Sequence, residues 1–172
     1  MRPFKLKNNF IHKLQKKKYY LIIIILLNIS TNNLNANNYL YEKDHLILDL
    51  KNNIYWLRCS VGQIWNNGSC SGKAVKLNMK QVQQAKKIAK KDLGGNWRLP
   101  TRKELESIVC KKCNIPKIND IYFPNTPYEP FWTGDKNGWS KRFYWSVNFF
   151  TGHTFGRFTP EIPNFVRFVK EK

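Results

Sequence analysis

The chain has 172 residues, a length that suits one domain with a short extension. Of these residues 42% are hydrophobic and 15% aromatic, which is enough to build a buried core. Its formal net charge is +19, from 30 basic and 11 acidic residues. A surface this basic should attract polyanions, although the joint excess of Lys, Asn and Ile would also follow from an AT-rich genome, and composition does not choose between the two explanations.

A basic and then apolar segment opens the chain. Residues 1–18 carry seven basic residues and no acidic ones, residues 19–29 read YYLIIIILLNI, and a polar stretch ends at Leu34-Asn35-Ala36. This order is typical of a secretory signal peptide, and the apolar run is too short to span a membrane. We therefore expect a signal peptide over residues 1–36, with an uncleaved anchor as the alternative. Cleavage would lower the net charge from +19 to +12 and export a mature chain without a membrane span to the periplasm, the cell surface or the medium.

Four cysteines follow the expected signal peptide. In an oxidising compartment an even number of cysteines predicts disulfides, and of the three possible connectivities short loops favour Cys59–Cys70 and Cys110–Cys113. A zinc site would need four converging thiolates, and only one Cys-x-x-Cys pair is present, so we expect no metal. Cys110 and Cys113 could also act as a redox pair. Their place at the end of a predicted helix disfavours a thiolate, which makes a structural bridge the preferred interpretation.

The first half of the mature chain predicts two strands and two helices. Residues 37–45 should be a flexible N-terminus, and residues 46–172 should form the domain. Residues 46–57 are typical of two strands around a turn at 51–53, and residues 59–70 of a loop with a turn at Asn67-Gly68. Residues 78–92 predict a helix capped by Asn78 and ended by Gly94. Its buried face should consist of four aliphatic residues, Val82, Ala85, Ile88 and Ala89.

The segment GNWRLPTRKEL, residues 95–105, contains the start of the second helix. Thr101 and Glu104 have the spacing of a capping box, in which each side chain bonds the backbone amide of the other. Leu105, Ile108 and Val109 should give this helix its buried face, and it should end near Cys110.

The second half predicts an ordered loop and further strands. Three prolines mark residues 123–132 as a loop, residues 142–158 alternate like a hairpin with its turn at Thr151-Gly152, and residues 164–170 resemble a last strand. The order of strands, helices, loop and strands predicts an α+β fold with two helices and a small antiparallel sheet.

No catalytic pattern is present in the mature sequence. It has two histidines, His45 and His153, no metalloprotease, nucleophile-elbow or phosphate-loop motif, and no paired carboxylates. We therefore expect a protein that is not an enzyme and needs no cofactor.

Two groups of basic residues are the candidate binding residues. The first is a stripe on the predicted helix 78–92, made of Lys86, Lys87, Lys90 and Lys91, whose spacing would suit the charges of an extended polyanion. The second interleaves cations with Trp139 and Tyr144, whose rings could stack on sugars, and consists of Lys136, Lys141, Arg142 and Arg157. The alternative is a solvated basic surface without a dedicated ligand. Nucleic acid would fit the charge, but export argues against it.

The mature chain resembles the bacterial Lcl C-terminal domain family over residues 46–170. The matching pieces are Leu48-Asp49, Tyr55-Trp56, RCSVGQIWNNGSCSG, GGNWRLPTRKEL, IPKINDIYFPNTPYEPFW, YWSVNFFTG and FVRFVK, in family order. The resemblance implies a C-type-lectin-like fold related to the formylglycine-generating proteins. The namesake member is a collagen-like adhesin whose C-terminal domain binds sulfated glycosaminoglycans and forms trimers.

Departures from the relatives limit what carries over. The chain has no Gly-X-Y repeat, so a homo-oligomer is not indicated. No cysteine follows Cys113, so the chemistry of the oxidase relatives is not implied. Glu129-Pro130-Phe131 lacks the third ligand of a calcium-dependent lectin. We expect an exported, adhesin-like protein that binds an anionic polysaccharide or another polyanion, with a periplasmic assembly factor and a thiol-redox protein as the alternatives.

Overall fold

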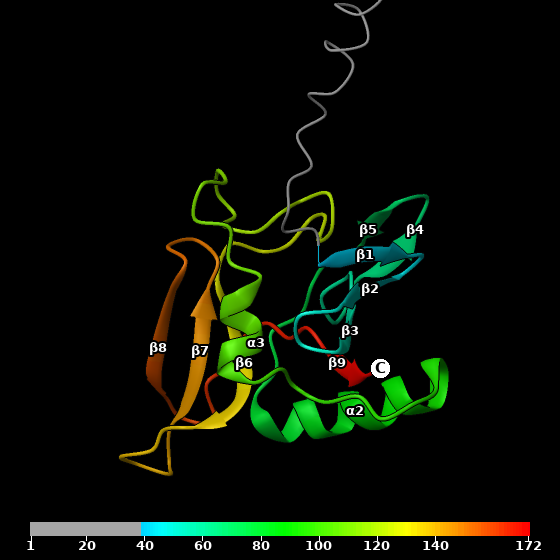
Figure 1. The fold of residues 1–172 in the computed structure, drawn as a ribbon. Coiled ribbons are helices and arrows are strands. Elements are labelled where there is room, and N and C mark those ends of the chain that lie inside the picture. The colour runs from blue at the N-terminus through cyan, green and yellow to red at the C-terminus, as the bar shows by residue number, and fades with distance from the viewer. Residues whose placement is uncertain (1–38) are drawn as a thin grey trace, which may run out of the picture. The chain divides into compact units, whose positions relative to one another are not determined.

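The computed structural model describes residues 39–172, which form an α+β fold as the sequence predicts (Figure 1). The expected signal peptide lies outside the described residues. Four short strands build one antiparallel sheet in the order β1-β2-β3-β9; their bounds are Leu40–Lys43, Leu46–Asp49, Ile54–Leu57 and Val169–Glu171. The two strands predicted in residues 46–57 are β2 and β3. The last strand covers only the end of the predicted segment 164–170, because residues 164 and 165 form isolated bridges instead.

Two smaller antiparallel sheets complete the β-structure. Strands β4 (Ile64–Asn66) and β5 (Ser69–Ser71) form a hairpin within the stretch that we expected to be a loop. Its turn residues Asn67 and Gly68 both have positive φ, at 47° and 78°, as an Asn-Gly hairpin turn requires. The third sheet has the order β6-β7-β8, with bounds Pro130–Lys136, Tyr144–Asn148 and His153–Phe158. Strand β6 begins inside the predicted loop 123–132.

Helix α2 (Met79–Leu93) has the predicted ends. Asn78 and Gln81 form a capping box at its start, and Gly94 caps its end. Val82 and Ala89 are buried, but the prediction that Ile88 is buried is wrong, since its side chain is 60% exposed. At about 100° per residue Ile88 lies about 120° from Val82 around the helix, and so it falls at the edge of the buried stripe.

Helix α3 (Arg102–Ser107) starts at the predicted capping box. The Thr101 hydroxyl accepts a hydrogen bond from the Glu104 amide over 3.2 Å, and the Glu104 carboxylate accepts one from the Thr101 amide over 2.7 Å. The helix ends at Ser107, earlier than expected. It packs against β6 and β7 (Figure 1).

The start of the described chain is ordered. Leu40–Lys43 form the edge strand β1, which differs from the flexible segment expected over residues 37–45.

Two clusters of buried side chains make up the core. One contains Trp56, Phe131 and Phe149, and the other joins α2 to Trp97 and Trp132.

Candidate functional site: two basic groups and an apolar groove

The four lysines of the predicted stripe lie on α2. Lys87, Lys90 and Lys91 are exposed, whereas Lys86 is half-buried. Lys86 lines a hollow of about 380 Å³ between α2 and the start of β7, together with Arg98, Asp135 and Tyr144. The stripe is therefore a solvated helix face with one lysine that turns toward the third sheet.

The second basic group gathers beside the same tyrosine. Lys136, Lys141 and Arg142 line a hollow of about 340 Å³ that also includes Tyr144. The structure therefore brings three of the four predicted residues of this group together. The fourth, Arg157, is exposed on β8 and does not line this hollow. Because Tyr144 lines both hollows, Lys86 of the first group lies next to the second group, whereas Lys87, Lys90 and Lys91 line neither hollow.

Trp139 lies in the connection between β6 and β7 and is 99% exposed. Hydrogen bonds hold the backbone around it. The Asn137 side-chain oxygen accepts from the amide of Trp139 over 2.8 Å, its side-chain nitrogen donates to the Gly156 carbonyl over 2.7 Å, and the Asn137 amide donates to the Phe143 carbonyl over 2.8 Å. An indole so exposed on a hydrogen-bonded loop makes no core contribution, and it lies within three residues of the three clustered cations.

An apolar groove that the sequence did not predict lies between α2 and the β4–β5 hairpin. It measures about 530 Å³. Ile64 and Trp65 line its hairpin side, and Ile88 and Leu93 line its helix side. The single indication of this groove in the sequence was Ile88, which lies at the edge of the apolar stripe of the helix. We had assigned its side chain to the buried face.

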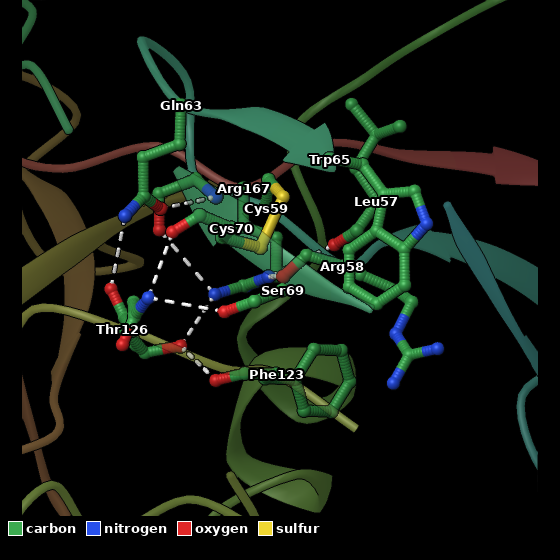
Figure 2. Close-up of a disulfide and its surroundings, with 12 residues drawn as sticks. Leu57, Arg58, Cys59, Gln63, Trp65, Ser69, Cys70, Phe123, Thr126 and Arg167 are labelled. Atoms are coloured by element: carbon green, nitrogen blue, oxygen red, sulfur yellow. Dashed lines mark hydrogen bonds between the residues drawn. A yellow bond between two sulfur atoms is a disulfide. The ribbon is translucent and has the colours of Figure 1, made fainter. Parts of the chain in front are cut away.

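The Cys59–Cys70 disulfide closes the neck of this hairpin (Figure 2). Asn125 fixes the hairpin from the other side, since its side-chain nitrogen donates to the Cys70 carbonyl over 2.8 Å. Gln63 in turn donates to the Asn125 carbonyl over 3.1 Å. The hairpin wall of the groove is thus built on a covalent bond and on contacts with a distant loop.

A buried arginine supports the same neck. Arg167 is fully buried, and its guanidinium donates to the carbonyls of Leu57 and Arg58 and to the hydroxyls of Ser60 and Thr126 (Figure 2). No acidic side chain contacts it among the described residues. Burial lowers the pKa of Arg167 to about 9. In place of a carboxylate, neutral oxygen acceptors and the rings of Phe123 and Phe131 surround the guanidinium.

The charges at the groove are acidic. Asp44 has a left-handed backbone, with φ at 54°, and its carboxylate accepts hydrogen bonds from the Trp65 indole over 3.0 Å and pairs with His45 over 3.1 Å. These bonds, that of His45 first, hold the pKa of Asp44 below its usual value. Asp92 also lines the groove, and its carboxylate makes no hydrogen bond or ion pair with any described residue.

The predicted disulfide pairing is confirmed, because Cys59 is bonded to Cys70 and Cys110 to Cys113. Within residues 39–172 no group of three or more His, Cys, Asp or Glu side chains is arranged to hold a metal ion. No helix in that part of the chain is long and apolar enough to cross a membrane.

Comparison with known proteins gives one match. The model of the Lcl C-terminal domain family matches residues 45–170, which is most of the chain and nearly all of the described part. No curated protein and no solved structure matches the sequence or the fold. The matched range contains both disulfides, the capping box of α3 and every lining residue of the groove except Asp44, and the chain belongs to the Lcl C-terminal domain family.

Proposed function

We propose that this protein is an exported, adhesin-like binding protein that recognises anionic glycans, of the glycosaminoglycan type, or a similar surface polyanion. The observation that carries the proposal is the gathering of Lys136, Lys141 and Arg142 beside Tyr144, with Lys86 of the α2 stripe on the other side of that tyrosine. Membership of the family and the net charge of +12 expected for the exported chain support it, and we further propose that the α+β fold is of the C-type-lectin kind.

The group around Lys136, Lys141 and Arg142 is the better candidate for the main contact. Lys136 lies 5.5 Å from the Tyr144 ring centroid, and Arg142 stacks on Phe143 at 4.5 Å, so both cations are held near aromatic surface. Trp139 offers an exposed ring on which a sugar could stack, while the neighbouring cations could pair with sulfates or carboxylates. The lysines of α2 would extend the positive surface along a longer chain.

Acidic side chains limit where a polyanion could lie. Asp135 lines the hollow beside Lys86, where its carboxylate accepts a hydrogen bond from the Arg102 amide over 2.7 Å. Glu161 lines the other hollow. An anionic ligand would therefore pass over Tyr144 and the outer cations and would not fill either hollow.

A matched pair of triple variants tests the proposal. The first replaces Lys136, Lys141 and Arg142 with Ser, and the control replaces Lys103, Lys111 and Lys112, three exposed lysines elsewhere, so that both lose three charges. We expect the first variant to elute from immobilised heparin at clearly lower salt than the control, while both elute alike from a sulfonate cation exchanger. Equal elution of the two variants from heparin would show that net charge alone governs binding and would overturn the proposal.

A further inference from the structure

The groove between α2 and the β4–β5 hairpin concentrates exposed apolar side chains. Ile64, Ile88 and Leu93 are 73%, 60% and 45% exposed, and all three line it together with Trp65. Large apolar side chains that gather at one hollow, rather than being scattered singly, are typical of a binding site. A volume of about 530 Å³ falls within the range of small-molecule sites.

The groove is held open by contacts that do not depend on a ligand. The disulfide and Asn125 fix the hairpin, and the Trp65 ring is held between two partners. The guanidinium of Arg58 lies 4.1 Å from its centroid, and Asp44 accepts its indole N–H. Arg58 is itself buried and donates to the carbonyls of Ile121 and Tyr122. The hairpin wall is thus preorganised, which lowers the entropic cost of binding.

The charge of the groove is opposite to that of the chain. Among the residues that the structure describes, none of those lining the groove is a lysine or an arginine, whereas Asp44 and Asp92 both line it. In a chain with 30 basic and 11 acidic residues, two carboxylates beside an apolar surface favour a ligand that carries a positive charge. Asp92 has no partner of its own among the described residues.

We infer that this groove binds a small organic cation with an apolar body, such as an aliphatic or aromatic amine. The apolar body would lie between Ile64 and Ile88, and the ammonium group would face Asp92 or Asp44. The groove shares no lining residue with the two hollows at Tyr144, so that neither proposal depends on the other.

Three ligands with the same body and different charges test the inference. We would titrate the protein with 4-phenylbutylamine, 4-phenylbutanol and 4-phenylbutyrate and follow the indole N–H resonances by nuclear magnetic resonance, with Trp65→Phe to assign the signal of Trp65. The amine should bind with a Kd of about 0.1–1 mM, shift the Trp65 signal most and bind at least about threefold more tightly than the alcohol. The acid should bind more weakly than both.

Variants at the groove and matched variants elsewhere complete the test. Ile88→Lys places a cation in the groove and should weaken amine binding at least about tenfold, and Asp92→Asn should weaken it several-fold. Ile115→Lys and Asp120→Asn change exposed residues outside the groove and should leave it unchanged. Equal binding of the alcohol and the amine, no effect of Ile88→Lys, or shifts centred on another tryptophan would overturn the inference. A sedimentation coefficient of Ile88→Lys below that of the unmodified protein would also overturn it. Such a change would mean that the substitution separates a dimer, in which a second copy of the chain occupies the groove.

Discussion

Arg98 and Glu104 form a two-point ion pair, in which the two terminal guanidinium nitrogens donate to different carboxylate oxygens over 2.8 and 2.9 Å. The same guanidinium contacts Glu171, the last residue of β9, over 2.6 and 2.9 Å, and the backbone of Arg98 pairs with that of Val169. Glu104 is also the capping residue of α3. This pair therefore ties the start of α3 to β9, and it gives the RLPTRKE segment a structural role.

Replacing Glu104 with Gln should destabilise the fold. The variant keeps the size of the side chain but removes the charge that pairs with Arg98 and weakens the cap at Thr101. Because the Glu104 side chain is only 12% exposed, we expect a loss of about 2 kcal/mol in the free energy of unfolding, measured by urea denaturation. Glu161→Gln, at an exposed carboxylate with no partner among the described residues, is the control. Equal midpoints for the two variants would contradict the structural role.

The same carboxylate should make stability depend on pH. Burial on its own raises the pKa of Glu104, but hydrogen bonds from Arg98 and from the Thr101 amide outweigh it and hold the pKa below the ordinary 4.5. The unfolded chain then binds a proton at higher pH than the folded one, so this stabilisation is complete above about pH 4.5 and is lost as the pH falls through the folded pKa. Urea unfolding between pH 3 and 6 should show a shallower acid loss for Glu104→Gln than for the unmodified protein. Parallel curves would contradict this prediction.

The sequence predicted those elements whose signals are local. A capping box is encoded within four residues, and for that reason the starts of α2 and α3 are where we expected them. The edge strand β1 has no such signal, since three of its four residues are exposed and it forms by pairing with β2. Arg102 likewise had no explanation from the sequence. In the fold its guanidinium stacks on Trp145 at 4.5 Å, a contact with a residue far along the chain.

In the candidate sites, too, the sequence predicted what is encoded locally and missed what tertiary contacts create. Periodicity placed the lysines of α2 on one helix face, but it could not show that the second basic group lies next to one of them, Lys86, at Tyr144. The groove depends on Asp44, Trp65 and Ile88, which come from a turn, a hairpin and a helix. No local pattern encodes such convergence, because it results from tertiary packing of the three segments.

Replacing Gly156 with Ala should disturb the third sheet. A Cβ atom at this position would lie 2.7 Å from the Trp145 ring, and that ring is covered on a face by Arg102, so it cannot move without loss of contact. We expect a destabilisation of about 1–3 kcal/mol and a lower Tm by circular dichroism. Gly138→Ala is the matched control, since nothing lies within 4 Å of a Cβ there. A Gly156→Ala variant as stable as this control would show that the ring adapts.

Removing the Cys59–Cys70 disulfide should weaken both the fold and the groove. Its cysteines are 11 residues apart, and closing a loop of that size stabilises a folded chain by about 3 kcal/mol. The double variant Cys59→Ser, Cys70→Ser should therefore unfold at lower urea concentration and should bind 4-phenylbutylamine less tightly. The Cys110→Ser, Cys113→Ser variant, which lies outside the groove, should keep full amine binding. Free thiols in the purified protein at all four positions would contradict the disulfide assignment itself.

Replacing Arg167 with Lys should be more damaging than its conservative chemistry suggests. The two terminal nitrogens of Arg167 reach four acceptors, on Leu57, Arg58, Ser60 and Thr126, and a single ammonium group cannot bond all of them. The substitution would leave a buried cation with fewer hydrogen bonds and buried oxygens without donors, so we expect a loss of about 3 kcal/mol or more. Urea denaturation measures it, with the exposed Arg157→Lys as the control. If Arg167→Lys unfolds at the same urea concentration as Arg157→Lys, a positive charge alone satisfies this part of the core, and the forked hydrogen bonding is not what holds the hairpin neck to the segment before β9.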